Sequence, residues 1–142
     1  MASRELHCVV VTPERALLDV KADFVALPMY DGELGVLPGR APLIGRLGHG
    51  ELRIRQGATT TYLFVSGGFV QVRGDTVSVL TSVARPAGEI KPAEVQATLA
   101  GLMDKLKQTA GEEAQQAVRT SIDKARAQLR VVRHADSEAA TA

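Results

Sequence analysis

The first part of the chain alternates apolar and polar positions in short runs. From Glu5 to about Ala84 these runs are rich in β-branched and aromatic residues and are separated by glycine and proline, a composition typical of strands and turns. In residues 51–56, Leu52 and Ile54 alternate with two arginines. Such a strand has one dry face and one wet face. The pattern predicts a β-rich domain over residues 1–86.

Turn signals divide this domain at intervals that suit an antiparallel sandwich or barrel. They fall at Tyr30-Asp31-Gly32, Pro38-Gly39, Gln56-Gly57, Gly67-Gly68 and Arg73-Gly74-Asp75. Ser66-Gly67-Gly68 lacks the Gly-x that precedes the serine of a nucleophile elbow, so we expect a hairpin turn there. No crossover helices separate the runs, which excludes a parallel βαβ sheet.

After residue 86 the spacing of apolar residues changes to that of amphipathic helices. The two stripes consist of Val95, Leu99, Leu102 and Leu106, then Val118, Ile122, Ala125, Leu129 and Val132. Pro92 suits a first helical turn, and the pattern breaks near Gly111. We therefore expect an antiparallel helical hairpin over residues 87–134. The stretch 135–142 has no apolar stripe, so a disordered tail is predicted.

The helical stripes are narrow and diluted by alanine. Two such helices bury too little apolar surface to offset the entropy of ordering them. The hairpin must therefore pack on the β-domain or on a partner. A marginal hairpin on a stable domain can have two docking states that differ little in free energy.

Composition excludes several classes of protein. The 142 residues carry a net charge of +1, which provides no overall field for nucleic acid or an anionic bilayer. The single cysteine, Cys8, cannot form an internal disulfide, so a buried thiol is expected. No run approaches the roughly 20 apolar residues of a membrane span, and residues 1–12 do not resemble a signal or transit peptide.

No catalytic or metal-binding constellation is visible. His7, His49 and His134 lie in different segments, without a carboxylate or cysteine at ligand spacing. A Walker-type loop and a GxGxxG loop opening a helix are both missing. Glu112-Glu113 suits the start of a helix, where acidic side chains complement the dipole. We expect a protein without enzymatic activity, metal or cofactor.

Positive charge gathers in the second predicted helix. Against a single acidic residue, Asp123, stand Arg119, Lys124, Arg126, Arg130 and Arg133, a local net charge of +4. Such a run is often only a solvated helix face. The alternative is a contact with an acidic protein partner.

Four strings carry a resemblance to a known family. They are DGELGVLPGRAPLI at 31–44, GELRI at 50–54 and VSGGF at 65–69, with AQLRV at 127–131 near the end. They resemble the sequences of bacterial F-type ATP synthase epsilon subunits, and the resemblance covers essentially the whole chain. The family fold is an antiparallel β-sandwich of about ten strands followed by a helical hairpin, in agreement with the two periodicities.

The resemblance implies a non-catalytic rotor subunit of the central stalk, which couples ion translocation to ATP synthesis. Its sandwich would bind the gamma subunit and rest on the c-subunit ring, with Asp31, Glu33 and Arg40 nearest the ring. The alternative for Gly32, Gly35 and Gly39 is purely conformational, since a sandwich needs tight chain reversals whether or not a partner touches them. The implied location is the cytoplasmic face of the bacterial cell membrane, where the complex alone provides membrane attachment.

By the same resemblance, the hairpin either folds against the sandwich or extends toward the alpha/beta catalytic hexamer and blocks ATP hydrolysis. Arg119, Lys124, Arg126, Arg130 and Arg133 are the candidates for contact with the beta subunit. The alternatives are a stand-alone β-sandwich binding module and a nucleotide sensor.

Some bacterial members of the family bind ATP through an I-D-x-x-R-A motif that follows a glutamate. In this chain Lys91 stands at the aspartate position, Glu94 at the arginine position and Arg85 at the upstream glutamate position. Every matched charge is reversed, and Glu94 would repel phosphate. We therefore expect weak or absent ATP binding by this motif.

Overall fold

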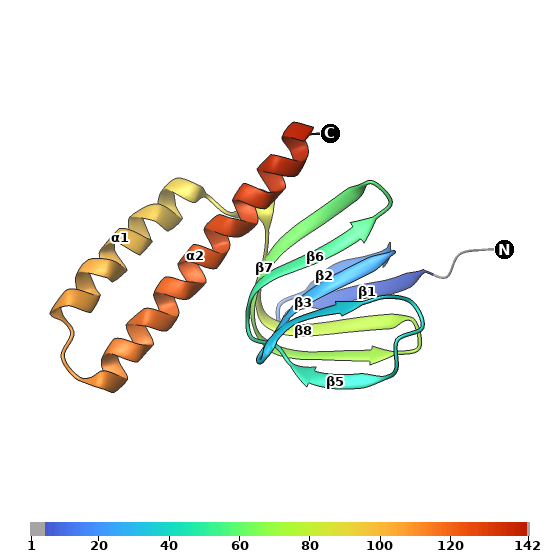
Figure 1. Cartoon of the computed structure of the whole chain (residues 1–142), viewed down its shortest axis with the longest axis horizontal. Coiled ribbons are helices and arrows are strands. Elements are labelled where there is room, and N and C mark those ends of the chain that lie inside the picture. The colour runs from blue at the N-terminus through green and yellow to red at the C-terminus, as the bar shows by residue number, and fades with distance from the viewer. Residues whose placement is uncertain (1–4, 142) are drawn as a thin grey trace.

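Two parts of different secondary structure follow each other along the chain (Figure 1). The computed structural model describes residues 5–141. The strands are β1 (Leu6–Val11), β2 (Ala16–Ala22), β3 (Phe24–Met29), β4 (Gly32–Val36), β5 (Leu43–Arg46), β6 (His49–Gln56), β7 (Thr59–Arg73) and β8 (Thr76–Pro86). The helical part consists of a 3-10 turn, η1 (Ala87–Glu89), and the helices α1 (Pro92–Gln108) and α2 (Glu112–Thr141). Within residues 5–141, neither helix is both long and apolar enough to cross a bilayer.

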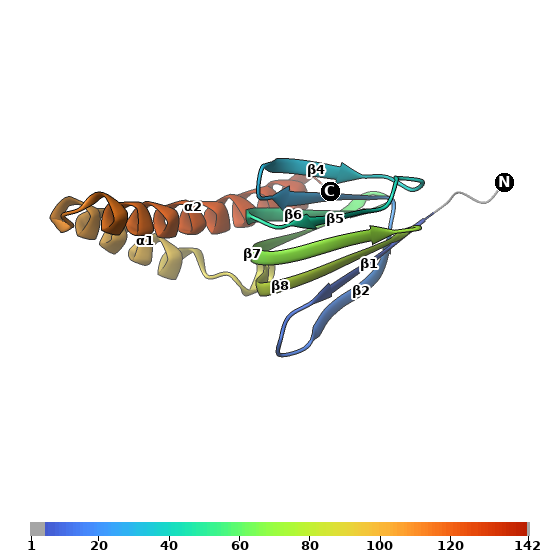
Figure 2. The ribbon, with the colours of Figure 1, turned by 90° about the horizontal axis from the view of Figure 1, so that it is seen from below.

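The strands form a β-sandwich, as predicted (Figure 2). Strands β3, β4 and β6 belong to one layer and β1, β2, β5 and β8 to the other, and the long strand β7 joins the layers because it pairs with β6 in its first half and with β5 in its second. The hydrogen-bonded order is β2-β1-β8-β7-β6-β3-β4, and β5 pairs with β7. Two expectations need correction. The described residues contain eight strands where about ten were expected, and β1 pairs with β8 in parallel. The parallel pair needs no crossover helix, because six other strands connect its members.

Gly67-Gly68 is a corner inside β7, so the prediction of a hairpin turn there was wrong. Strand β7 pairs with β6 up to Ser66 and with β5 from Phe69 onward. Both glycines have positive φ, +75° and +117°, and the buried Thr81 hydroxyl donates to the Gly67 carbonyl at 2.6 Å. A strand that changes partners at a sandwich corner needs the same backbone freedom as a turn. The sequence signal is therefore the same for both.

The three two-residue hairpin turns fall where glycine predicted them. The β3–β4 turn precedes Gly32, the β6–β7 turn contains Gly57 and the β7–β8 turn contains Gly74. Gly57 and Gly74 have φ near +60°, the left-handed conformation that favours glycine. These turns fix the register of the strands that carry the surfaces described below.

The interior of the sandwich is apolar. Its buried side chains come from β1, β2, β3, β4, β6, β7 and β8 and include Leu27, Leu52, Ile54 and Val79. Cys8 lies in this core with no measurable exposure. Burial raises the pKa of the Cys8 thiol to about 12, because an apolar interior disfavours the thiolate.

Cys8 is therefore expected to be inert in the folded protein. A thiol reagent at pH 8 should label native protein at least 100-fold more slowly than protein unfolded in guanidinium chloride, on the order expected from the suppressed thiolate and from burial. Absorbance of the released chromophore measures both rates. Rapid labelling of native protein would contradict the buried position of β1.

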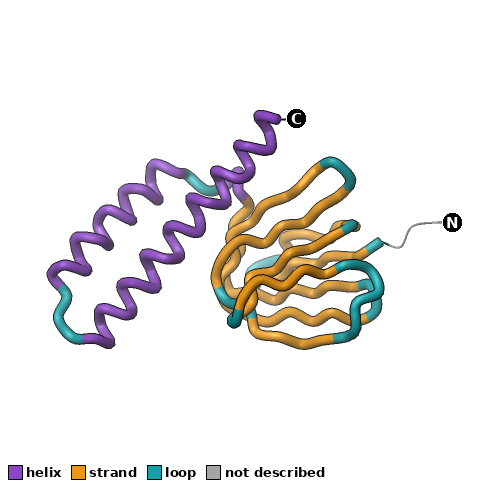
Figure 3. The backbone as a smooth tube through the Cα atoms, in the orientation of Figure 1, coloured by secondary structure: helices purple, strands orange, loops and turns teal. Residues whose placement is uncertain are grey.

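The hairpin is attached to the sandwich through α2. Helix α2 packs on β6, β7 and η1, whereas α1 packs on α2, and the tube in Figure 3 shows α1 on the outer side of the pair. A second, smaller apolar cluster fills the contact. Its buried members are Phe64, Ile90, Val95, Ala125, Ala127 and Val131. Four of these six side chains are valine or alanine, so the apolar attachment is thin.

The expectation of a disordered tail over residues 135–142 is corrected by the structure. Helix α2 continues to Thr141, and residue 142 lies outside the described residues. Two reasons account for the helix. Its alanines favour helical conformation, and Glu138 accepts a hydrogen bond from the Thr60 backbone N–H at 2.7 Å. The anchor comes from a strand 78 residues away, which no local pattern reveals.

Candidate interaction surfaces

The three residues predicted to face a ring of subunits do not form one surface. Asp31 lies in the β3–β4 turn and Glu33 in the adjoining part of β4, and both are exposed. Arg40 follows the opposite end of β4. Its neighbour Gly39 donates a backbone hydrogen bond to Asp75, in the β7–β8 turn, at 3.0 Å. The structure therefore brings Asp31 and Glu33 together and places Arg40 at the other end of the sandwich.

The basic residues of α2 form a stripe, with one exception. Counting 100° per residue around the helix, four of the five point within about 60° of one another, and all four are exposed. These four are Arg119, Arg126, Arg130 and Arg133. Lys124 lies on another side and is half-buried. In the docked hairpin the stripe faces solvent rather than the sandwich.

An apolar patch on the outer face of the sandwich was missed in the sequence. Phe69 and Leu80 are opposite each other on β7 and β8, and Ile44 on β5 shares their side of the sheet. Their exposed fractions are 58%, 53% and 76%. Large apolar side chains clustered on a surface mark a contact site. The sequence did contain a signal for this patch. Leu80 directly follows the inward-facing Val79, so the alternation of the strand turns Leu80 outward, and a large apolar residue at an outward position indicates a contact surface.

Strand β7 carries a second missed signal. Leu63, Phe64 and Val65 are all buried, although neighbouring residues of a strand point to opposite faces. Leu63 and Val65 belong to the sandwich core, and Phe64 belongs to the cluster beneath the hairpin. Three consecutive apolar residues thus marked a segment that is covered on both faces.

The three positions matched to a nucleotide motif converge on one cavity. Arg85, Lys91 and Glu94 line a space of about 530 Å³ between the end of β8 and the hairpin, together with Glu89 and residues of both helices. Lys91 Nζ lies 3.9 Å from Glu94 Oε1, and Arg85 Nη1 donates to the Gln128 Oε1 at 3.4 Å. Two cations and two carboxylates line the cavity, so it offers no net positive charge to phosphate.

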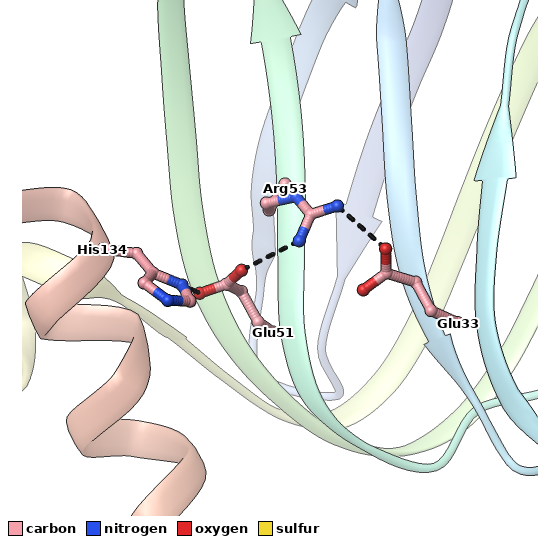
Figure 4. A network of polar contacts seen from close by, with 4 residues as sticks. All are labelled: Glu33, Glu51, Arg53 and His134. Carbon is pink, nitrogen blue, oxygen red and sulfur yellow. Dashed lines mark hydrogen bonds and ion pairs between the residues drawn. The ribbon is translucent and has the colours of Figure 1, made fainter. Parts of the chain in front are cut away.

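A chain of polar contacts links the sandwich to α2 (Figure 4). Arg53 on β6 donates to Glu33 on β4 at 2.8 Å and to Glu51 at 3.3 Å. The other Glu51 oxygen lies 2.6 Å from His134 Nδ1 on α2, and the Glu51 side chain is only 10% exposed. Burial opposes the charge of Arg53, yet its two carboxylate neighbours raise its pKa.

Next to this chain, Tyr62 on β7 contacts both His134 and Glu138. The rings of Tyr62 and His134 are tilted, with centroids 6.1 Å apart. The hydrogen bond from Tyr62 is the main cause that lowers the pKa of Glu138. Burial, followed by the Glu138 carboxylate, raises the pKa of Tyr62. Both shifts favour an ionised Glu138 beside a neutral Tyr62.

Two of the three histidines have a carboxylate partner in the fold, and neither partner is near in sequence. His7 on β1 pairs with Asp19 on β2, and His134 pairs with Glu51. Each pair joins one histidine to one carboxylate. Among residues 5–141, no group of three or more metal-binding side chains is present.

Comparison with known proteins gives matches to one family. The model of the family "ATP synthase, Delta/Epsilon chain, beta-sandwich domain" matches residues 5–87. The ATP synthase epsilon chain of Rhodopirellula baltica is 50% identical over 90% of this chain and 98% of its own length. That of Granulibacter bethesdensis is 40% identical over 88% and 95%, respectively.

Two solved structures share the fold. A chain of the Euglena gracilis mitochondrial ATP synthase superposes with a TM-score of 0.76 at 21% identity, over 88% of this chain and 81% of that one. A chain from the central stalk and c ring of the Tetrahymena thermophila enzyme gives 0.61 at 14% identity, over 93% and 99%.

Proposed function

Because this chain belongs to the ATP synthase epsilon-chain family, we propose that it is a central-stalk subunit of an F-type ATP synthase that couples ion translocation to ATP synthesis and restrains hydrolysis through its hairpin. It is a non-catalytic member of that family. The observation that carries the regulatory part is the attachment of the whole hairpin through one helix and a thin apolar cluster. Such a module can leave the sandwich without unfolding it.

The apolar patch on β5, β7 and β8 is the surface we assign to the gamma subunit. Phe69, Leu80 and Ile44 are exposed in the isolated chain, and they lie on the outer face of the sandwich, away from its core. Phenylalanine and other aromatic side chains are enriched at protein interfaces, and the buried core of an interface is more apolar than the rest of a protein surface. A permanent rotor contact would cover them.

We assign the contact with the c-subunit ring to the end of the sandwich that carries Asp31 and Glu33. Both carboxylates are exposed there. The adjacent Tyr30 ring stacks on the Arg46 guanidinium, whose Cζ lies 4.6 Å from the centroid of the ring. Charged and polar side chains at this end of the sandwich could form polar contacts with the polar loops of the c-subunit ring. Arg40 lies at the opposite end and would belong to a different contact. Membrane attachment then comes through the complex, at the cytoplasmic face of a bacterial membrane.

The basic stripe on α2 is the surface we assign to the beta subunit of the catalytic hexamer. Arg119, Arg126, Arg130 and Arg133 face solvent while the hairpin is docked. Extension of the hairpin toward the hexamer would place this stripe against an acidic segment, and such pairing favours association with a correctly charged partner. Lys124 lies off the stripe and would contribute least.

Nucleotide sensing is the weaker alternative function. The cavity that contains Arg85, Lys91 and Glu94 pairs each cation with a polar or acidic neighbour. An entering triphosphate would have to displace these contacts and would face two carboxylates. The mixed charge of the cavity therefore supports weak or absent ATP binding.

Removal of the hairpin is expected to release hydrolysis. A variant that ends at Gly88 keeps all eight strands, and it should raise the ATP hydrolysis rate of the assembled complex several-fold. Steady-state phosphate release measures the effect. A full-length variant with Arg119, Arg126, Arg130 and Arg133 changed to glutamine should raise it similarly, whereas glutamine at Lys105 and Lys107 of α1 is the matched control. Equal rates in truncated and intact complexes would refute the inhibitory role.

A further inference from the structure

We propose that the last turns of α2 form a polar latch, made by His134 and Glu138, that sets how firmly the hairpin is held on the sandwich. The inference rests on the proposed function, since it describes the regulation of the same hairpin. The two side chains are four residues apart, so they lie on one face of α2. Each reaches a different strand of the sandwich, β6 or β7.

Glu138 binds an edge of the sheet that no strand covers. Strand β8 begins to pair with β7 only at Leu63, so among the described strands the start of β7, from Thr59 to Tyr62, pairs with β6 alone. The Thr60 N–H at this edge donates to Glu138 Oε1 at 2.7 Å. A half-buried backbone N–H needs a hydrogen-bond acceptor. At this edge Glu138 of α2 supplies the acceptor that a neighbouring strand would otherwise provide.

His134 binds a carboxylate that is already held in place. Glu51 is nearly buried and also accepts from Arg53, which in turn pairs with Glu33. Arg53 therefore fixes one Glu51 oxygen and leaves the other for the imidazole, 2.6 Å away. A charge-assisted hydrogen bond to a preoriented, nearly buried group is among the stronger side-chain contacts.

The latch matters because the apolar attachment is thin. Val131 of α2 is fully buried, but the other two buried side chains that α2 contributes to this cluster are the small Ala125 and Ala127. Polar contacts at the end of the helix therefore contribute a large share of the docking free energy. Loss of these contacts should shift the hairpin toward the detached state. The strand pairing of the sandwich does not depend on them and should stay intact.

The test uses the isolated full-length chain with the variants His134→Ala and Glu138→Ala. Alanine favours helix, so neither change unwinds α2. The readout is the relaxation of the Val131 methyl groups by a soluble paramagnetic agent, together with amide hydrogen exchange at Thr60. In His134→Ala the acceptor of Thr60 is intact, so faster exchange there reports detachment rather than a lost local bond.

We expect each variant to expose the Val131 methyl groups several-fold more often, and His134→Ala to speed Thr60 exchange by a similar factor. Asp136→Ala is the matched control, because residue 136 is exposed and lies about 200° around the helix from both latch residues. The Val79 amide, in the sandwich core, should exchange at the original rate in all three. Unchanged Val131 exposure and Thr60 exchange in His134→Ala would overturn the latch.

Hydrolysis by complexes that carry the same variants separates the latch from the proposed function. A weaker latch should favour the extended hairpin and lower the hydrolysis rate. If Val131 becomes exposed while hydrolysis does not fall, the latch stands and the inhibitory role of the hairpin fails. If neither changes, the latch is refuted, whatever the truncated chain shows.

Discussion

Replacing Gly68 with alanine is expected to destabilise the sandwich severely. A Cβ at this position would lie 1.9 Å from the Leu80 carbonyl oxygen and 2.8 Å from the Thr81 Cα. Both are backbone atoms of β8, so the clash is relieved only by separating β7 from β8. The φ of +117° adds strain for any side chain. The cost should exceed about 4 kcal/mol, a large part of a typical domain stability of about 5–15 kcal/mol.

Thermal unfolding followed by circular dichroism measures the effect. Gly57→Ala is the matched control, since Gly57 also has positive φ, +60°, but nothing lies within 4 Å of its added Cβ. That variant should lose only about 1 kcal/mol from backbone conformation. If both variants unfold at the same temperature, the corner at Gly67-Gly68 is not packed as described.

The double variant Phe69→Glu, Leu80→Glu is expected to abolish stable binding to the gamma subunit. The two side chains are cross-strand neighbours in the centre of the apolar patch, and an interface would bury both carboxylates without partners. Affinity should fall at least about 100-fold, as expected for the loss of two central apolar contacts. Gel filtration of the mixed subunits, followed by titration calorimetry, measures it.

The control for that variant is Met103→Glu. Met103 is another exposed apolar residue, 43% accessible, but it lies on α1, away from the patch. It should leave gamma binding unchanged. Both proteins should unfold at nearly the original temperature, because the altered residues are already exposed. Full gamma affinity in the double variant would show that the patch is not the gamma surface.

The two halves of the fold were predictable because each has one clear periodicity. Leu52 and Ile54 face the sandwich core as their alternation requires, and Val95, Val118, Ile122 and Ala125 are buried at their helical spacing. Two features were not predictable. A corner and a turn use glycine in the same way at Gly67-Gly68, and the parallel pairing of β1 with β8 depends on the whole topology.

The surfaces were predictable only where the residues that form them lie close together in the sequence. Arg85, Lys91 and Glu94, matched through the family resemblance, do meet at one cavity. The contacts of His134 with Glu51 and of Glu138 with Thr60 join residues 83 and 78 positions apart. They depend on how α2 crosses β6 and β7, which no pattern within one segment encodes. The apolar patch had a signal, since Leu80 breaks the alternation of its strand.

The uncovered start of β7 has a consequence for the subunit outside its complex. Whenever α2 lifts, the main-chain groups of Thr59–Tyr62 become a template on which another extended chain can add, the usual route to β-sheet aggregation. The stretch is short, rich in threonine and ended by the Gly57-Ala58 turn, which limits such growth. A free subunit with a detached hairpin would thus be prone to aggregation during assembly. The docked hairpin covers that edge and so prevents strand addition until the subunit joins its complex.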